Sequence, residues 1–223
     1  MIDPVWERKY AEGFDQRYPW DSVVSFVYRY APICGDRESL RILEVGFGSG
    51  SNLWFAAREG ISVSGIEGSY SAVSKARERF RQEGLQADLR QGDFTRLPFE
   101  SNHFDLVIDR AAITHVGRSE HIKAIGEVRR VMKTGGFFHF NAYAEGHSSS
   151  EDAIAGEDGT RVAMSRGSLL DVGQVYFSTP GDINEFFAKG WKLHQFQRRE
   201  WKDLLSSNEN IHAEWMLIAE KLE

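Results

Sequence analysis

The residues best suited to chemistry in this chain begin in a glycine-rich stretch, residues 43–52, which reads LEVGFGSGSN. An apolar strand runs into an acid, and three glycines two positions apart follow it (Glu44, Gly46, Gly48 and Gly50). A backbone without β-carbons can turn sharply and approach a ligand closely. The stretch predicts a nucleoside-like cofactor at the end of the first core strand, although a tight turn between strand and helix would need similar residues.

The glycine spacing separates two classes of cofactor. A dinucleotide fold requires G-x-G-x-x-G, but the position three after Gly48 is Ser51, and the extra glycine is Gly50. The pattern E-x-G-x-G-x-G resembles motif I of the class I S-adenosylmethionine-dependent methyltransferases. The resemblance implies a loop under the methionine part of S-adenosyl-L-methionine and an acid near its amino end. It assigns these residues to the cofactor: Glu44, Gly46, Phe47, Gly48, Ser49, Gly50 and Asn52.

A second acid follows at an interval that suits ribose binding. Residues 61–66 alternate as a strand does, and Glu67 closes them, 21 positions after Gly46. A carboxylate there can accept hydrogen bonds from both ribose hydroxyls. Alone, Glu67 would be a solvated acid at a strand end, but in this register we place Glu67 and Gly68 at the ribose.

Three later segments extend the resemblance over residues 40–143. Asp93 stands where the family has an acid beside the adenine amino group, and Phe94 could pack on the adenine ring; a Gly-Asp turn is the alternative. Residues 104–110 look like motif IV, whose end faces the transferred methyl group, so Asp109 and Arg110 join the predicted site. Residues 128–140 resemble the element that leads to the fifth strand.

Two side chains are candidates for catalysis. His115 follows the fourth predicted strand, and its ordinary pKa suits a general base near neutral pH, although many single histidines are structural. Tyr143, at the end of the fifth strand, is a candidate contact to the acceptor. Arg110 could bind a carboxylate of cofactor or acceptor. No cluster of metal ligands is evident, so we predict transfer without a metal.

Two segments outside the core are predicted to shape substrate choice. Residues 6–20 are dense in aromatic side chains and are either a simple docking helix or a lid over cofactor and acceptor; the lid candidates are Trp6, Tyr10, Tyr18 and Trp20. Residues 144–178 form a polar stretch, which is either disordered or an acceptor-binding loop.

Composition limits the remaining choices. The chain has 223 residues and a net charge of −6, from 27 basic and 33 acidic residues, and no basic stripe, which disfavours a nucleic-acid partner. The single cysteine, Cys34, excludes an intramolecular disulfide and a cysteine-based zinc site. No signal core or long apolar run is present, so we expect a cytoplasmic protein without a membrane partner. Homo-oligomerisation cannot be read from the sequence.

The alternation of strands and helices predicts an α/β, Rossmann-like fold. We expect one domain over residues 1–223, with a mostly parallel seven-stranded sheet, helices on both faces and an antiparallel edge at the C-terminus. Its parts are a helical lid segment (1–35), a cofactor-binding core (40–143), a variable substrate loop (144–178) and a C-terminal helix with strands (179–223). Ligands of such sheets lie beyond the carboxyl ends of the strands.

The predicted function is methyl transfer to oxygen or nitrogen of a small-molecule acceptor by in-line displacement. Residues 109–112 read Asp-Arg-Ala-Ala, in place of the Asn-Pro-Pro-Tyr or Asp-Pro-Pro-Tyr of families that methylate base or glutamine nitrogens. One alternative is a catalytically silent, regulatory module that binds S-adenosylmethionine. A nicotinamide oxidoreductase is a third hypothesis, and Ser51 in place of the third glycine opposes it.

Overall fold

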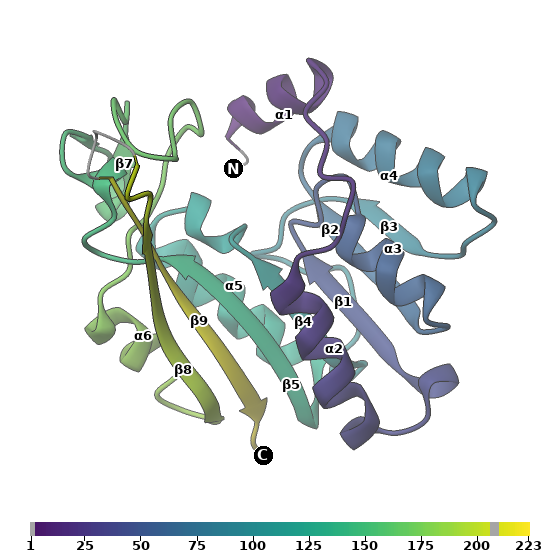
Figure 1. Ribbon diagram of the computed structural model, residues 1–223. Helices are drawn as coiled ribbons and strands as arrows, with labels where there is room; N and C mark the ends of the chain where they lie inside the picture. The colour runs from purple at the N-terminus through teal and green to yellow at the C-terminus, as the bar shows by residue number, and fades with distance from the viewer. Residues whose placement is uncertain (1–2, 206–209) are drawn as a thin grey trace.

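The computed structural model describes residues 3–205 and 210–223, and in them one large sheet runs through the molecule (Figure 1). Its strand order is β3-β2-β1-β4-β5-β9-β8; β1 to β5 are parallel, and β9 and β8 add an antiparallel edge. This confirms the predicted fold class. The strands are β1 (Arg41–Val45), β2 (Ser62–Glu67), β3 (Asp88–Gln91), β4 (Phe104–Arg110), β5 (Met132–Tyr143), β8 (Trp191–Lys202) and β9 (Ile211–Lys221).

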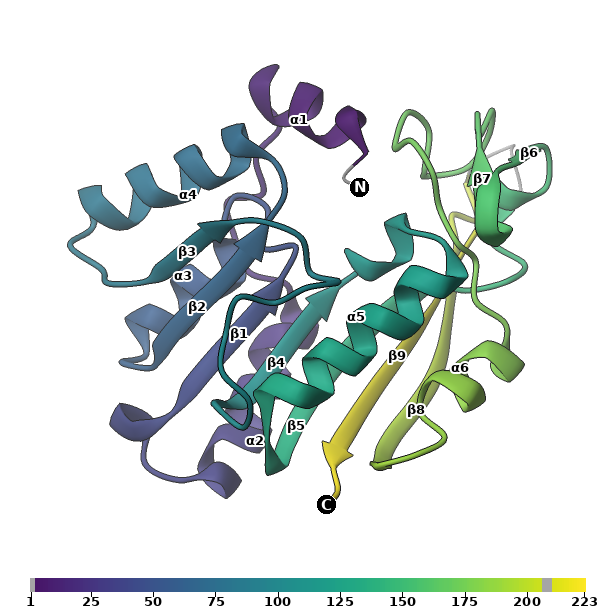
Figure 2. The same cartoon turned by 180° about the vertical axis from the view of Figure 1, so that it is seen from behind.

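Helices cover both faces of the sheet. Successive side chains of a strand point to opposite faces, so each face presents apolar side chains that helices bury. In β1, Ile42 faces a core shared with Val23 of α2, whereas Leu43 faces a core shared with Val128 of α5. Helices α2 to α4 lie on one face, and α5 and α6 lie on the other, as the view from behind shows (Figure 2). The helices are α1 (Pro4–Ala11), α2 (Asp21–Cys34), α3 (Ser51–Arg58), α4 (Tyr70–Gln82), α5 (Arg118–Val131) and α6 (Pro180–Phe186).

The start and the buried stripe of α5 differ from the sequence-based expectation. Ser119 looks like a capping residue for this helix, but Gly117 is the N-cap, and Ser119 donates from its N–H and its hydroxyl to Asp158. The spacing of Ile122, Ile125, Val128 and Met132 predicts one buried stripe; the last three are buried, but Ile122 is exposed and His121 is buried instead. The apolar pattern favours the isoleucine, whereas His121 packs against Tyr176 and Phe186, with its Nδ1 at 3.0 Å from the carbonyl of Gly117.

The C-terminal elements begin as predicted but extend differently. Thr179 and Asp182 form a capping box at the start of α6, as the sequence indicates. The sequence predicts that Gly190 stops this helix, but the helix already ends at Phe186. The sequence also predicts two final strands over Trp191–Phe196 and Glu214–Glu220. The observed β8 and β9 are longer and pair from Trp191 with Lys221 to Lys202 with Ile211.

Burial of His139 in β5 predicts a pH-dependent stability. Its ring is fully buried, neither ring nitrogen has a hydrogen-bond partner among the described residues, and burial lowers the pKa of His139 to about 4. The unfolded chain binds a proton here below about pH 6.5 while the folded chain does not, so this residue destabilises the fold as the pH falls.

We therefore expect His139→Leu to reduce the loss of unfolding free energy between pH 7 and pH 5 by about 2 kcal/mol, measured by urea denaturation. His103→Leu, in the turn before β4, is the control for losing a histidine outside the core. A variant that loses as much stability as the wild type over this range would contradict the prediction.

Candidate functional site

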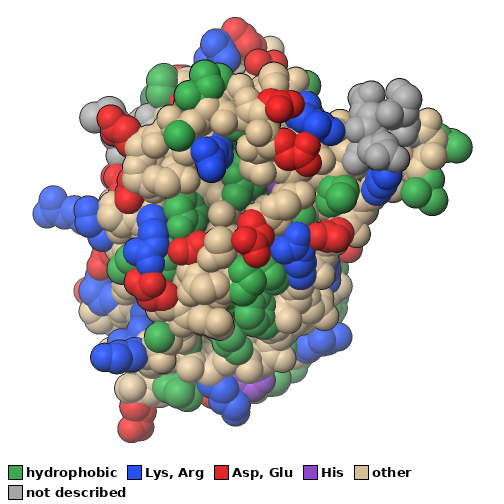
Figure 3. Space-filling model, turned by 90° about the vertical axis from the view of Figure 1, so that its left-hand side faces the viewer, with side chains coloured by type: hydrophobic (Ala, Val, Ile, Leu, Met, Phe, Trp, Pro, Cys, Tyr) green, Lys and Arg blue, Asp and Glu red, His purple; other side chains and the backbone are tan. Residues whose placement is uncertain are grey.

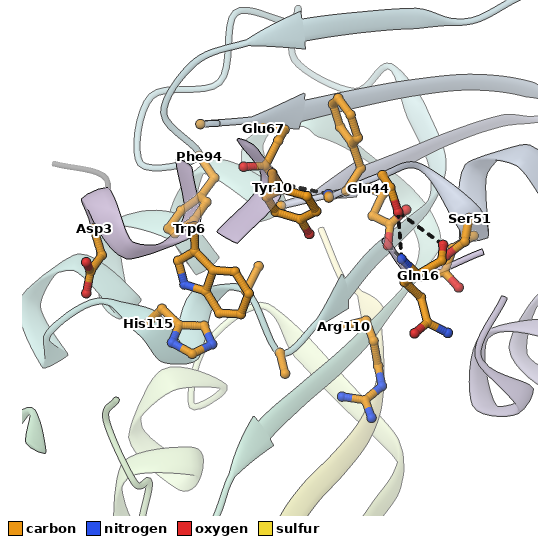
Figure 4. A pocket seen from close by; sticks show the side chains of 18 of the residues that line it. Asp3, Trp6, Tyr10, Gln16, Glu44, Ser51, Glu67, Phe94, Arg110 and His115 are labelled. Carbon is orange, nitrogen blue, oxygen red and sulfur yellow. Dashed lines mark hydrogen bonds between the residues drawn. The ribbon is translucent and has the colours of Figure 1, made fainter. Parts of the chain in front are cut away.

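A cavity of about 510 Å³ lies at the carboxyl ends of the parallel strands, beneath α1 (Figure 4). This is the edge at which ligands of open α/β sheets bind. Most residues that the sequence singled out line this one cavity, although they come from separate parts of the chain. From the predicted cofactor set, the lining includes Glu44, Gly46, Phe47, Gly48, Ser49, Asn52, Glu67, Gly68, Asp93, Phe94 and Arg110, and from the other predicted sets it includes Trp6, Tyr10, Trp20, His115 and Tyr143.

Three predicted residues do not line the cavity. Gly50 is the N-cap of α3 in a left-handed conformation, with φ of 79°, and serves the turn into that helix. Asp109 is fully buried, and its carboxylate accepts from the backbone N–H groups of Ala112 and Ile113. Tyr18 is 65% exposed on the surface. The structure therefore does not place these three residues in the lining of the site.

The glycine loop is a cradle that side chains would fill. Gly46 and Gly48 have φ of 66° and 55°, which only glycine adopts readily. A β-carbon on Gly46 would lie 2.1 Å from Cβ of Ala112, and one on Gly48 would lie 2.3 Å from the hydroxyl of Tyr10. The loop therefore keeps its backbone open to the cavity, with Tyr10 of α1 directly against it.

Glu44 carries an unpaired buried oxygen beside this loop. Its Oε1 accepts from Nδ2 of Asn52 at 2.7 Å, whereas its Oε2 has no hydrogen-bond partner in the part of the chain that the structure describes. Burial raises the pKa of Glu44 to about 8. A buried carboxyl of this kind gains most from a cationic partner, so the amino group of S-adenosylmethionine fits this position.

Glu67 joins the end of β2 to the glycine loop. Its Oε2 accepts from the N–H of Gly48 at 2.9 Å, and its Oε1 accepts from the N–H of Ser69 at 2.8 Å. Burial raises the pKa of Glu67. Each carboxylate oxygen keeps a further lone pair, so this fixed carboxylate can accept two more hydrogen bonds, and its role at the ribose stays a prediction.

At the end of β3, Asp93 is held by Thr95, whose N–H and hydroxyl both donate to Oδ1 at 2.8 Å. Oδ2 is left for a ligand, and Phe94 lines the cavity beside it. An acid next to an aromatic ring suits an adenine amino group and ring face. The ends of β1, β2 and β3 thus present three acids in the order in which the sheet places their strands.

The N-terminal segment is fastened over the cavity by polar contacts. Glu7 of α1 accepts from the hydroxyls of Ser69 and Ser71, at 2.7 and 2.6 Å, at the start of α4. These hydrogen bonds lower the pKa of Glu7. The backbone of Gln16 exchanges two hydrogen bonds with the hydroxyl of Ser49. The segment thus covers the site, and that it opens as a lid stays a prediction.

Loss of the Glu7 contacts should loosen this cover. We expect Glu7→Ala to weaken binding of S-adenosylhomocysteine about fivefold, because closing then loses about 1 kcal/mol of charge-assisted hydrogen bonding at a partly exposed site. Calorimetry measures this directly, and Glu12→Ala on the same segment is the control. Equal affinities of the two variants would show that Glu7 does not hold the closed form.

His115 is held in one tautomer. Its Nδ1 lies 3.0 Å from the carbonyl oxygen of Gln174, so Nδ1 carries the hydrogen and Nε2 is left as an acceptor. Nε2 of Gln174 donates in turn to the carbonyl of His115. Burial lowers the pKa of His115 to about 4, which keeps the ring neutral. The indole of Trp6 meets the ring edge-on at 4.9 Å.

Arg110 brings the one cationic side chain of the described lining. Its guanidinium lies 3.9 Å from the ring centre of Trp20, donates to the side-chain oxygen of Asn141, and lies 3.7 Å from the carboxylate of Glu214. Nearby, burial raises the pKa of Tyr143 to about 12, so its phenol stays protonated. Both side chains offer N–H or O–H donors to an anionic group.

Comparisons with known proteins support the same assignment. Residues 42–136 match the family model described as "Methyltransferase domain". Over these residues the chain has the methyltransferase domain of the class I S-adenosylmethionine-dependent family. It is 32% identical over 136 residues to sterol 24-C-methyltransferase ERG6B of Gibberella zeae, and 34% identical over 98 residues to phosphatidylethanolamine N-methyltransferase of Cereibacter sphaeroides. These matches cover 58% and 43% of this chain, but only 33% and 47% of the two relatives.

The fold of this methyltransferase is also seen in solved structures. A methyltransferase from Methanosarcina mazei superposes with a TM-score of 0.72 at 22% identity, over 92% of this chain and 99% of that one. At that identity the likeness concerns the fold alone. Among the described residues, no helix is both long and apolar enough to cross a bilayer, and no group of three or more metal-binding side chains was found.

Residues 144–178 contact the cavity-lining residues from outside. None of them is among the residues that line the cavity, and their role as an acceptor-binding loop stays a prediction. They fold as short turns and two short strands, β6 (Ile154–Ala155) and β7 (Arg161–Val162), around a small core that includes Met164. The carbonyl of Gln174 orients His115, and the hydroxyl of Ser168 lies 2.7 Å from Nδ1 of His212. The N–H of Gln174 also donates to Asp3 at 3.0 Å.

The β8–β9 hairpin supplies two lining residues that the sequence analysis missed, Trp201 and His212. They form a stacked pair, with ring centres 4.4 Å apart. The predicted antiparallel edge was the signal that could have found them. An antiparallel pair carries the end of β8 and the start of β9 to the edge where β1 to β5 end. The other lining residues that were missed are Asp3, Phe14, Gln16, Ser51, Gly92, Thr95, Ala111, Ala112 and Val116.

Proposed function

We propose that this protein transfers the methyl group of S-adenosylmethionine to an oxygen or nitrogen atom of a small-molecule acceptor. The observation that carries this proposal is the convergence of three strand-end acids and the glycine loop on one covered cavity. Glu44 would hold the amino group of the cofactor, Glu67 its ribose and Asp93 its adenine. When bound, the cofactor supplies a methyl group on a positively charged sulfur.

The remaining lining side chains would handle the acceptor. His115 presents an unprotonated Nε2, which can orient an acceptor hydroxyl or amine and receive its proton. Tyr143 and Arg110 can position a polar group beside it. The indole of Trp6 lies against the His115 ring and would keep water away from it, which strengthens these contacts.

The class of acceptor rests on two kinds of support. Asp109 begins a tight turn in which its carboxylate binds the N–H groups of Ala112 and Ile113, and this segment has no Pro-Pro-Tyr sequence for holding a flat amide or base. The names of two relatives refer to small acceptors, a sterol and phosphatidylethanolamine. A small organic acceptor is therefore favoured over a base in nucleic acid or a protein glutamine.

Transfer of labelled methyl groups tests the proposal. The protein is incubated with S-adenosylmethionine carrying an isotopically labelled methyl group and with metabolite, nucleic-acid and protein fractions, and the labelled product is identified by mass. We expect label in the small-molecule fraction. Tight binding of S-adenosylhomocysteine without transfer to any fraction would instead favour the catalytically silent binding module. Binding of NAD but not of S-adenosylhomocysteine would overturn the cofactor assignment.

A further inference from the structure

Large apolar side chains surround the mouth of the cavity. Phe14, Trp20 and Trp201 line the cavity, yet they are 46%, 40% and 50% exposed. Two of them belong to the segment that joins α1 to α2, and the third lies at the end of β8. Side chains that are both cavity wall and molecular surface mark the entrance, so the entrance is apolar on two sides.

Further exposed apolar residues adjoin each side of this entrance. Tyr18 lies between Phe14 and Trp20 in the sequence, and Leu204 and Leu205 directly follow β8, 87% and 98% exposed. Figure 3 shows hydrophobic side chains on the lobe that projects from this part of the molecule. We call this set the apolar rim: Phe14, Tyr18, Trp20, Trp201, Leu204 and Leu205. Exposed apolar side chains beside a pocket are typical of a ligand or interaction surface.

The depth of the cavity has the opposite character. Arg110, His115, Tyr143 and His212 approach from β4, the turn after it, β5 and β9. Their guanidinium, imidazole and phenol groups can hydrogen-bond a polar ligand head. A ligand that satisfies both regions must therefore be polar at the end that enters and apolar at the end that remains near the surface.

The segments that carry the rim hold charges of both signs, Arg17 and Asp15 in one and Lys202 and Asp203 in the other. On the α4 side, Lys75 and Arg79 donate to the backbone carbonyls of Phe14 and Arg17. Basic groups therefore lie beside this side of the rim, and the rim side chains themselves contribute apolar contact.

We propose that the methyl acceptor is an amphiphile, with a compact polar head carrying the reactive oxygen or nitrogen and an apolar body that rests on the apolar rim. This inference rests on the proposed function, because it treats the cavity as the site of methyl transfer. The head reaches the polar groups around His115, while the body lies between Trp20 and Trp201 and continues over Leu204 and Leu205.

A homologous series of n-alkylamines, from butylamine to decylamine below their micelle concentrations, probes this surface by calorimetry. The protein is titrated with and without saturating S-adenosylhomocysteine. We expect affinity to rise about two- to threefold for each added methylene, somewhat less than full burial of the group would give. The rise should be present in both titrations, because Trp201, Leu204 and Leu205 lie at and after the end of β8, at the opposite edge of the sheet from β1 to β3 and their acids.

A double variant and a matched control locate the effect. In Leu204→Ser/Leu205→Ser we expect the rise to flatten for the longer amines, while the affinity for S-adenosylhomocysteine is unchanged. Ile33→Ser removes a comparably exposed apolar residue from the end of α2 and should leave the rise intact. Equal chain-length dependence in the double variant and the wild type would overturn the rim as the binding surface.

The outcomes separate this inference from the function on which it rests. No dependence on chain length in the wild type, despite binding of S-adenosylhomocysteine, would overturn the amphiphile and leave the methyltransferase proposal standing. A steep dependence without any affinity for S-adenosylhomocysteine would support the ligand class and overturn the proposed function. A concentration-dependent dimer in sedimentation that the double variant abolishes would assign the rim to a second copy of the chain and overturn the inference.

Discussion

His115→Ala should lower the rate of methyl transfer about 100-fold at saturating cofactor, the lower end of the range for losing a general base. His115 lines the cavity and presents an unprotonated nitrogen, Nε2, because its Nδ1–H donates to the carbonyl of Gln174. Binding of S-adenosylhomocysteine should be unchanged, because His115 follows β4 and the three strand-end acids lie on β1 to β3. The test measures initial rates with the acceptor that the labelling experiment identifies, and it measures the affinity for S-adenosylhomocysteine by calorimetry.

The pH dependence of the wild type adds a second check on His115. Because burial lowers its pKa to about 4, the ring should stay neutral as the pH falls from 8 to 5 and should take up a proton only near pH 4. The turnover rate should therefore show no inflection from this group between pH 5 and pH 8. An inflection near pH 6.5 that disappears in His115→Ala would contradict this account. His194→Ala, on the outer strand β8, is the control.

Glu67→Ala should weaken the binding of S-adenosylhomocysteine by about 1–3 kcal/mol, the usual cost of removing a charged hydrogen-bond partner. The carboxylate is rigidly placed, because the N–H groups of Gly48 and Ser69 hold one oxygen each. Removing it takes away the acceptor for ribose and also leaves two buried N–H groups without a partner. The affinity should be measured by calorimetry, with thermal unfolding of the free protein measured in parallel.

Glu67→Gln separates the two effects of this substitution. The amide keeps one oxygen acceptor for either Gly48 or Ser69 and has nearly the same shape, so the loop should be disturbed less than in Glu67→Ala. We expect a smaller loss of affinity with a smaller change in unfolding temperature. Full wild-type affinity in Glu67→Ala would remove this residue from the ribose site.

The fold could be predicted from sequence because its signals are local. Parallel strands separated by helices can form only a few topologies, and the glycine loop marks the end of β1. The strand-end position of Glu67 and Asp93 followed from that order alone, and both line the cavity. The family and the fold class were therefore correctly predicted.

Two features of the site could not be predicted from sequence. One is which partner a strand-end acid binds, and the other is which residues the pairing of distant strands brings to the cavity. A strand-end acid can either face a ligand or bind the next turn, and Asp109 does the second, through Ala112 and Ile113. Trp201 and His212 reach the cavity only through the pairing of two distant strands. The indirect action of residues 144–178 depends on Gln174 and Ser168, whose hydrogen bonds to His115, Asp3 and His212 belong to tertiary structure.

Gln174 has a wider consequence, because its N–H donates to Asp3 and its carbonyl accepts from His115. Asp3 is also the N-cap of α1, so the position of the covering helix and the tautomer of the imidazole are linked through a single backbone residue. Displacement of α1 should release both, which would leave the imidazole unaligned whenever water can enter. Covering of the bound substrate by α1 and alignment of His115 for proton transfer would then occur together.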